Sequence, residues 1–121
     1  MTSNSIGNLI AVLFLSREIT HREHLKTKSY AQHMALGSFY EEIIGLADSL
    51  AETYQGRVGR IEDIPYLGGT SGDIVEILKR LLSKVEEGRK ECCPEDSTIQ
   101  NIIDEIIALY LSTIYKLTFL K

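Results

Sequence analysis

The sequence predicts an all-α protein built as a four-helix bundle, and three observations support this fold class. Apolar residues recur with the 3.6-residue period of an amphipathic helix in four separate stretches. Segments containing Gly or Pro separate these stretches, and no useful length alternates with the two-residue period of a strand. The chain has 121 residues, 44% apolar and 25% charged, which suffices for one buried core. We therefore expect a single domain over residues 1–121.

The first predicted helix covers residues 5 to about 24 and contains the apolar run LIAVLFL at residues 9–15. Its apolar face is wide enough for contact with more than one neighbour, which could include a second subunit. The run is shorter than the roughly 20 apolar residues that span a bilayer. It also lacks a preceding basic stretch and a small-residue cleavage site, so a buried helix is favoured over a signal peptide and no membrane partner is expected.

The second predicted helix begins at a capping box and runs to about residue 55. Ser29 can accept the amide of the third helical residue, and Gln32 can reach back to the amide of Ser29. Gly56 is predicted to end the helix as a left-handed residue. Because the connection to the first helix is short, these two helices should be antiparallel neighbours.

A long structured connection is predicted between the second and third helices. Residues 56–70 include four glycines and Pro65, yet they also carry apolar side chains that a solvated loop would not: Ile61, Ile64, Tyr66 and Leu67. These side chains predict a short helical turn, packed on the bundle or used at an interface. Fully extended, about 15 residues reach roughly 50 Å, enough to carry the chain back along the bundle. A simple up-down-up-down bundle remains the other arrangement.

The last two predicted helices have clear starts. Asp73, followed by Glu76, supplies an acidic cap for the third helix, which is predicted to end near Gly88. The fourth helix is predicted to start at residues 94–96 with a capping box at residues 97–100. It is the most apolar of the four, with isoleucine, leucine and tyrosine at helical spacing up to residue 115.

Charge and cysteine content exclude some classes of function. The net charge is −4 and no basic segment stands near either end, which argues against DNA binding through phosphate contacts. Cys92 and Cys93 are adjacent, so they cannot join distant segments, and a reducing cytoplasmic setting is expected. Two neighbouring cysteines can bind a metal or become oxidised, but an incidental pair in the loop before the fourth helix is favoured.

Polar groups gather on one stripe of the second helix. At 100° per residue, His33, Glu41, Asp48 and Glu52 fall within about 100° of one another. Apolar positions flank this stripe, so it is more than a solvated face, and ionisable groups beside buried positions need a partner or a metal. Glu41 is interpreted as part of a solvated acidic patch.

Axial distance limits which of these side chains can share an ion. His33 and Asp48 are about 22 Å apart along a helix, far beyond the range of one ion. Asp48 and Glu52, one turn apart, are about 6 Å from each other and can share one. If His33 serves the same ion as the two carboxylates, two helices must meet antiparallel. A twofold-symmetric dimer does this and produces two equal intersubunit sites.

Two more histidines lie at the end of the first helix. His21 and His24 are one turn apart, and all three histidines of the chain lie within thirteen residues. Imidazole and carboxylate ligands suit iron, manganese or zinc and exclude no first-row metal. The competing interpretation is that these are hydrogen-bonded polar side chains without a metal.

Residues 21–52 resemble the Dps proteins, ferritin-like mini-cages that protect bacterial DNA. The family has one His late in its first helix and one early in its second, and His21 and His33 fit that spacing. Residues 48–52, Asp-Ser-Leu-Ala-Glu, look like the family signature Asp-x-x-Ala-Glu, and Tyr40 adds to the match. Residues 24–28 offer a second alignment, similar to His-Trp-x-x-Lys, so the choice between His21 and His24 stays open. Residues 28–33 look similar to uncharacterised Dps-like proteins of bacteriophages.

The resemblance implies a ferritin-like four-helix bundle, a homo-oligomer built on a twofold dimer, and an intersubunit ferroxidase-type iron site. His33 with His21 or His24 would come from one subunit and Asp48 with Glu52 from the other. Such a site oxidises Fe²⁺ with peroxide or oxygen, giving oxidative protection. The expected location is the cytoplasm of a bacterial host, or a virion if the chain is phage-encoded.

The chain also departs from the Dps pattern. Gly37 stands where the family usually places an acidic ligand, and the third helix is short. The Lys-rich tail that many members use for DNA has no counterpart here. The alternative hypothesis is therefore a non-catalytic helical bundle with a degenerate metal site, acting as a structural or interaction protein.

Overall fold

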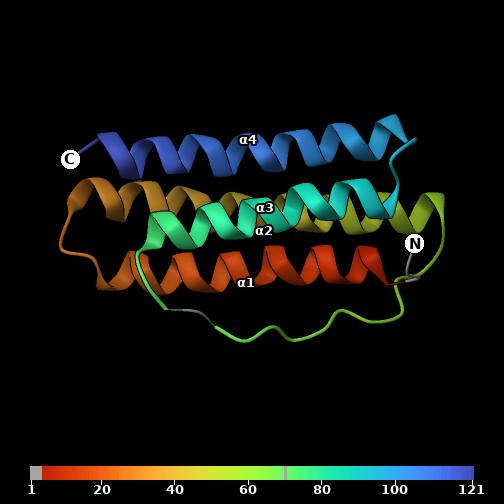
Figure 1. Cartoon of the computed structure of the whole chain (residues 1–121), viewed down its shortest axis with the longest axis horizontal. Coiled ribbons are helices and arrows are strands. Elements are labelled where there is room, and N and C mark those ends of the chain that lie inside the picture. The colour runs from red at the N-terminus through yellow and green to blue at the C-terminus, as the bar shows by residue number, and fades with distance from the viewer. Residues whose placement is uncertain (1–3, 70) are drawn as a thin grey trace.

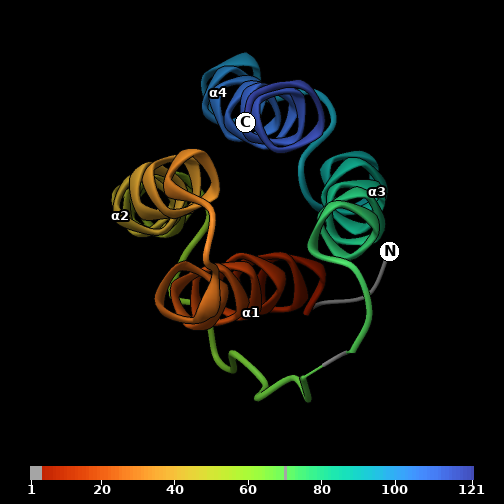
Figure 2. The same ribbon diagram turned by 90° about the vertical axis from the view of Figure 1, so that its left-hand side faces the viewer.

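The computed structural model is a bundle of four helices and describes residues 4–69 and 71–121. The helices are α1 (Ser5–Lys26), α2 (Tyr30–Arg57), α3 (Ile74–Cys92) and α4 (Ser97–Phe119). Both α1 and α4 pack against α2 and α3, so α1 lies diagonally opposite α4 (Figure 2). The described residues form no strand. The predicted all-α class and the four-helix layout are confirmed.

The connection between α2 and α3 decides the direction of the helices. We call its described residues, 58–69 and 71–73, the crossover; it runs back along most of the length of the bundle (Figure 1). As a result α2 and α3 run in the same direction, while the short turns make α1 antiparallel to α2 and α3 antiparallel to α4 (Figure 1). The bundle is therefore not a simple up-down-up-down arrangement. None of these four helices is long and apolar enough to cross a membrane, among the residues that the structure describes.

The core lies along the bundle axis and receives fully buried side chains from every helix. The Phe39 and Tyr110 rings meet edge to face with their centroids 5.0 Å apart. The Tyr110 hydroxyl donates a 2.5 Å hydrogen bond to Ser16 Oγ, and Ser16 in turn donates to a carbonyl of its own helix. Burial raises the pKa of the Tyr110 phenol, and the Ser16 bond only partly offsets this. This phenol, the one large polar group in the core formed by the described residues, thus stays neutral and hydrogen-bonded.

The start of α2 confirms half of the predicted capping box. Ser29 Oγ accepts from the Gln32 amide at 3.2 Å, as predicted. The prediction for the Gln32 side chain was wrong, because Gln32 Oε1 accepts from Thr27 Oγ1 at 2.7 Å. The Thr27 hydroxyl oxygen accepts the hydrogen bond from the Ser29 amide instead, at 3.1 Å. A threonine two residues earlier therefore performs the second half of the cap.

Two predicted helix ends were wrong because a glycine is not always a terminator. Gly56 lies inside α2, and the left-handed residue is Gly59, with φ +142°. Gly88 lies inside α3, where it is buried, and a β-carbon there would stand 3.1 Å from Leu9 Cδ1. Its lack of a side chain allows α1 and α3 to approach, so packing explains this glycine.

The start of α4 also differs from its prediction. The cap is Asp96, whose Oδ1 accepts the Ile99 amide at 3.2 Å, while Ser97 is the first helical residue. Asp96 Oδ2 accepts a 2.8 Å hydrogen bond from Arg57 Nε at the end of α2. The Ile99 amide and the Arg57 guanidinium both hold the pKa of Asp96 below its usual range. This cap therefore also ties α4 to α2.

The crossover is extended along the bundle and contains no helical turn among its described residues, so that part of the prediction was wrong. Its glycines and Pro65 disfavour a helix. Ile61 and Ile64 pack against the core, whereas Tyr66 is fully exposed. The crossover touches α1 at Gly7, where any β-carbon would collide with the Asp63 carbonyl. Two apolar side chains and one close contact at Gly7 thus hold the extended crossover against the bundle.

Candidate metal-binding face

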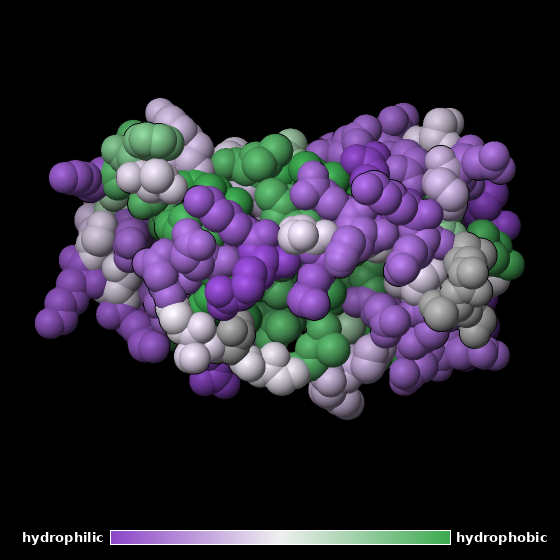
Figure 3. Space-filling view, viewed as in Figure 1, coloured by the Kyte–Doolittle hydropathy of each residue, from purple (hydrophilic) through white to green (hydrophobic). Residues whose placement is uncertain are grey.

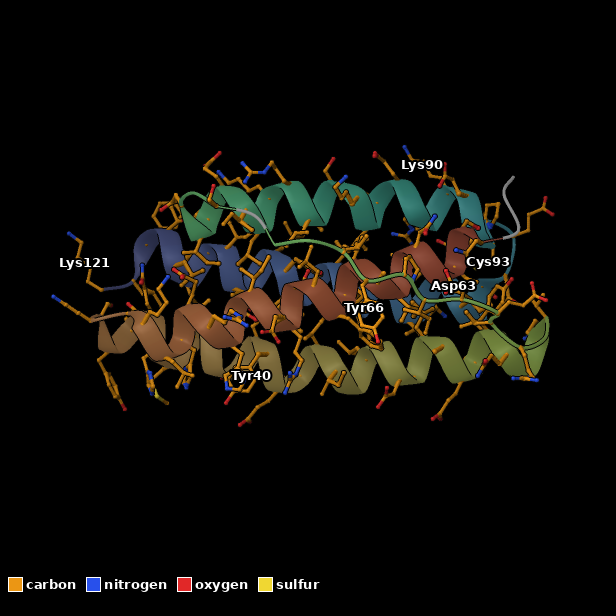
Figure 4. The ribbon with its side chains drawn as sticks, turned by 90° about the horizontal axis from the view of Figure 1, so that it is seen from below. Tyr40, Asp63, Tyr66, Lys90, Cys93 and Lys121 are labelled. Carbon is orange, nitrogen blue, oxygen red and sulfur yellow. A yellow bond between two sulfur atoms is a disulfide. The ribbon has the colours of Figure 1, made fainter. Side chains whose placement is uncertain are left out.

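The three histidines and one tyrosine form an aromatic cluster between α1 and α2. We call it the histidine cluster; all four of its side chains are half-buried: His21 and His24 from α1, His33 and Tyr40 from α2. Because α1 and α2 are antiparallel and joined by a short turn, residues equally far from that turn meet across the two helices. The cluster therefore lies near the turn, on the face of the bundle shown in Figure 4, where Tyr40 is labelled.

His24 and His33 are joined by two reciprocal contacts. His24 Nδ1 lies 2.6 Å from the His33 carbonyl oxygen, and His33 Nδ1 lies 2.9 Å from the His24 carbonyl oxygen. The two rings stack with their centroids 3.8 Å apart. A carbonyl oxygen can only accept, so each Nδ1 carries a proton and donates it. When such a ring carries no second proton, its Nε2 atom keeps a free lone pair.

Gly37 makes the position of His24 possible. A β-carbon at residue 37 would stand 3.0 Å from Cε1 and 3.1 Å from Nδ1 of the His24 ring. Contacts this short require the ring to move, and the ring is held by its bond to the His33 carbonyl. A side chain at residue 37, a carboxylate included, would therefore compete with the present position of the His24 ring.

His21 and Tyr40 form the second layer of the cluster. Their rings are nearly parallel, with an interplanar angle of 8° and centroids 4.1 Å apart. The Arg17 guanidinium carbon lies 6.0 Å from the centroid of the Tyr40 ring, within range of a cation–π contact. The His21 and His24 centroids are 6.3 Å apart. The structure thus brings all three histidines together but gives His21 an aromatic partner and His24 a carbonyl partner.

The two predicted carboxylate ligands lie elsewhere on α2. Asp48 and Glu52 are exposed and lie one turn apart. Glu41, nearer the start of α2, is exposed as well. Neither Asp48 nor Glu52 takes part in an ion pair within the described part of the chain. Among residues 4–69 and 71–121 no three His, Cys, Asp or Glu side chains of one chain stand close enough to hold a metal. One chain alone therefore does not assemble the predicted ligand set, in agreement with the axial distances.

The cysteines lie apart from the histidine cluster, at the α3–α4 end of the bundle (Figure 4). Cys92 is the last residue of α3 and is buried, so the expectation that both cysteines lie in a loop was wrong. A disulfide joins Cys92 to Cys93. Because the two residues are adjacent, this bond links no separate elements and adds no ligand to the candidate site.

Sequence reasoning missed the carbonyl partners of the imidazoles and the role of Gly37. The signal was available in part, since a short turn between antiparallel helices pairs residue 24 with a residue near 33. Which nitrogen meets which carbonyl depends on side-chain rotamers and on helix separation. Spacing along the chain contains neither.

Fold and site together define a class of protein: a four-helix bundle with one long crossover and with the histidine cluster between its first two helices. The chain belongs to the family of unknown function DUF5856, whose model matches residues 24–117. The matched range contains His24, His33, Asp48 and Glu52, and it begins after His21. No curated protein and no solved structure matches the chain.

Proposed function

We propose that the protein is a Dps-like, ferritin-like homo-oligomer that binds iron or another divalent first-row metal between two copies of the chain. The direction of the helices supports the ferritin-like part, because one long crossover with parallel second and third helices is the connectivity of that fold. The resemblance of residues 21–52 to the Dps motif supports the metal site.

The observation that carries the proposal is the reciprocal bonding of His24 and His33. Metal-binding histidines usually donate one ring N–H to a carbonyl or carboxylate, which fixes the tautomer and directs the other nitrogen to the metal. Both Nδ1 atoms here donate to a backbone carbonyl. Each Nε2 is thereby kept available as a ligand. This favours His24 over His21 as the partner of His33.

The carboxylates of the proposed site come from the second copy. His33 and the midpoint of Asp48 and Glu52 are separated by 17 residues, about 25 Å along α2. An antiparallel α2 helix with its twofold axis beside residues 41–42 brings the His33 of each copy to the acidic pair of the other. Both carboxylates are exposed and free of ion pairs within the described residues, so they are accessible to a second copy.

The ligand chemistry suits ferrous iron as a substrate. Imidazole nitrogens bind Fe²⁺, and hard carboxylate oxygens favour the Fe³⁺ product. Oxidation transfers one electron from each Fe²⁺ to peroxide or dioxygen. The chain's own contribution is to hold the ion with two imidazole nitrogens and two carboxylates, whose negative charge stabilises the more positive ion.

An anaerobic Fe²⁺ titration, followed by addition of oxygen or peroxide, tests this proposal. The wild-type protein should take up iron in a fixed ratio to subunits, and Asp48→Ala with Glu52→Ala should abolish that uptake. Glu87→Ala with Glu91→Ala, also exposed and one turn apart but on α3, is the matched control and should keep it. Iron binding by the double variant at wild-type stoichiometry would disprove the assignment.

The alternative function is a non-catalytic structural or interaction module. The satisfied Nδ1 atoms and the missing carboxylate at Gly37 are also what a purely packed cluster would contain. Sizing chromatography beside metal analysis of the purified protein separates the two. A small, metal-free oligomer that ignores added Fe²⁺ supports the module.

A further inference from the structure

The outer face of α4 carries an exposed apolar ridge near its C-terminal end. Leu111, Tyr115 and Phe119 are spaced by four residues and are 54%, 54% and 69% exposed. The Tyr115 and Phe119 rings are in contact, with centroids 5.7 Å apart. Apolar surface covers this half of α4 at the upper left of Figure 3, whereas the N-terminal half of α4 is hydrophilic. A bulky apolar ridge is thus presented to the outside.

The same helix borders an open hollow on the N-terminal side of the ridge. The hollow lies between α2 and α4 and has a volume of about 680 Å³. Small residues form part of it, and a β-carbon at Gly45 would meet no other atom within 4 Å. Its lining combines small, apolar and acidic side chains: Gly45, Leu46, Ala108, Leu109 and Ser112 with Glu41, Glu42 and Glu105. The hollow is therefore acidic and large enough for a ring.

Two opposite charges flank the ridge on the side of α2. Glu105 and Lys116 are eleven residues apart, so they point within about 20° of each other and stand about 16 Å apart along α4. Both are exposed, and neither takes part in an ion pair within the described part of the chain. An antiparallel copy of α4 could supply the missing partner of each charge, because its Glu105 and Lys116 follow in the reverse order.

We propose that a second copy of the chain docks on this face, with the two α4 helices antiparallel and the twofold axis beside Leu111. The midpoint of Glu105 and Lys116 lies between residues 110 and 111, so this axis places Lys116 of each copy opposite Glu105 of the other. Leu111 then meets its own counterpart at the axis. Tyr115 lies opposite residue 106 of the other copy, above the hollow.

The face identifies a second copy because it is complementary to itself. Along α4, Glu105 and the hollow come first and Leu111 follows. The aromatic part of the ridge and Lys116 come after Leu111. Only an antiparallel copy presents these features in the reverse order, and a twofold contact repeats each of them twice. Lys116 also brings a positive charge to a rim that holds three carboxylates, which fixes the register. This interface goes beyond the proposed metal site, because it uses α4 and no ligand residue.

Zero-length carbodiimide cross-linking of the wild-type protein tests the register directly. Glu105 and Lys116 of one chain are too far apart on a rigid helix to be joined, so a cross-link between them must connect two copies. A mixture of ¹⁵N-labelled and unlabelled protein should therefore yield mixed-isotope Glu105–Lys116 peptide pairs. Absence of this pair, at a concentration where sizing shows an oligomer, overturns the proposal.

Charge reversal provides a second test. Glu105→Lys and Lys116→Glu should each weaken association at least about tenfold in sedimentation experiments, and the two together should restore it. Glu86→Lys and Lys90→Glu on exposed positions of α3 are the matched controls and should leave association unchanged. Circular dichroism identifies any variant that fails to fold. A double variant that associates no better than the single ones overturns the proposal, and iron uptake measured in parallel reports on the metal site separately.

Discussion

The two helical hairpins of this bundle are both tied by side chains that reach across to a backbone carbonyl, but with different chemistry. Between α3 and α4, Arg89 donates to Gln100 Oε1 at 2.7 Å and to Asp104 at 2.6 Å. Gln100 Nε2 returns a 3.0 Å bond to the Arg89 carbonyl and another to the Cys93 carbonyl. Between α1 and α2, His24 and His33 make the reciprocal contacts.

The two sets of hydrogen bonds differ in the lone pairs that they leave free. A guanidinium is always protonated and has no lone pair, and the amide of Gln100 uses both its oxygen and its nitrogen. An imidazole that donates from Nδ1 keeps a basic Nε2. The α3–α4 tie is therefore structural, while the α1–α2 tie retains atoms that can bind a metal or a proton.

Arg89→Ala should destabilise the protein by about 2 kcal/mol, because it removes three hydrogen bonds donated by the guanidinium and leaves Gln100 partly unpaired. Urea unfolding followed by circular dichroism measures the change. Lys90→Ala, on the neighbouring exposed position, is the control and should change stability by less than about 0.5 kcal/mol. Equal losses in the two variants would show that the α3–α4 network is not a structural tie.

His24→Ala should lower metal affinity at least about tenfold, whereas His21→Ala should leave it nearly unchanged. The reason is that only His24 has its Nδ1 bound to a carbonyl of α2, while His21 is stacked on Tyr40. Calorimetric titration with a redox-inert divalent ion such as Zn²⁺ provides the comparison. A larger loss with His21→Ala would reverse the ligand assignment.

Gly37→Ala should destabilise the protein by about 1 kcal/mol net. Displacement of the His24 ring costs about 1–3 kcal/mol, and the better helix propensity of alanine returns about 0.5–1 kcal/mol. Gly56→Ala is the control, because Gly56 is also helical but faces open space, and it should be neutral or stabilising. Thermal unfolding of both variants measures the difference. A stabilising Gly37→Ala would show that His24 moves freely.

The Asp96 cap should give a small, pH-dependent contribution to stability. Its folded pKa is lowered by the Ile99 amide and by Arg57. A lowered folded pKa means that the contribution is present above the unfolded value of about 3.9 and is lost as the pH falls through the folded pKa. Asp96→Asn keeps a capping oxygen without the charge, so its deficit against wild type should shrink below about pH 4 and disappear once the pH is below the folded pKa. A deficit that persists to pH 2 would exclude the charge as its source.

Sequence alone determined most of the fold, because hydrophobic periodicity and caps act over a few residues. The four helices, the Asp73 cap, the Ser29 cap and the single core all follow from such local patterns. The sequence also determined that one chain cannot complete the predicted ligand set. Rigid helix geometry by itself prevents His33 from sharing an ion with Asp48 and Glu52 of its own chain, because α2 is one continuous helix over all three positions.

Only the tertiary structure decided the features that depend on two helices at once. Gly88 was predicted to end the third helix and Gly37 was noted only as the place of a missing acidic ligand, yet one lies against Leu9 and the other against the His24 ring. The extended path of the crossover and the tautomer of each imidazole are also set by contacts between segments distant along the chain. A pattern along one helix contains the direction of each side chain but not the neighbour that it meets, and the neighbour determines the chemistry.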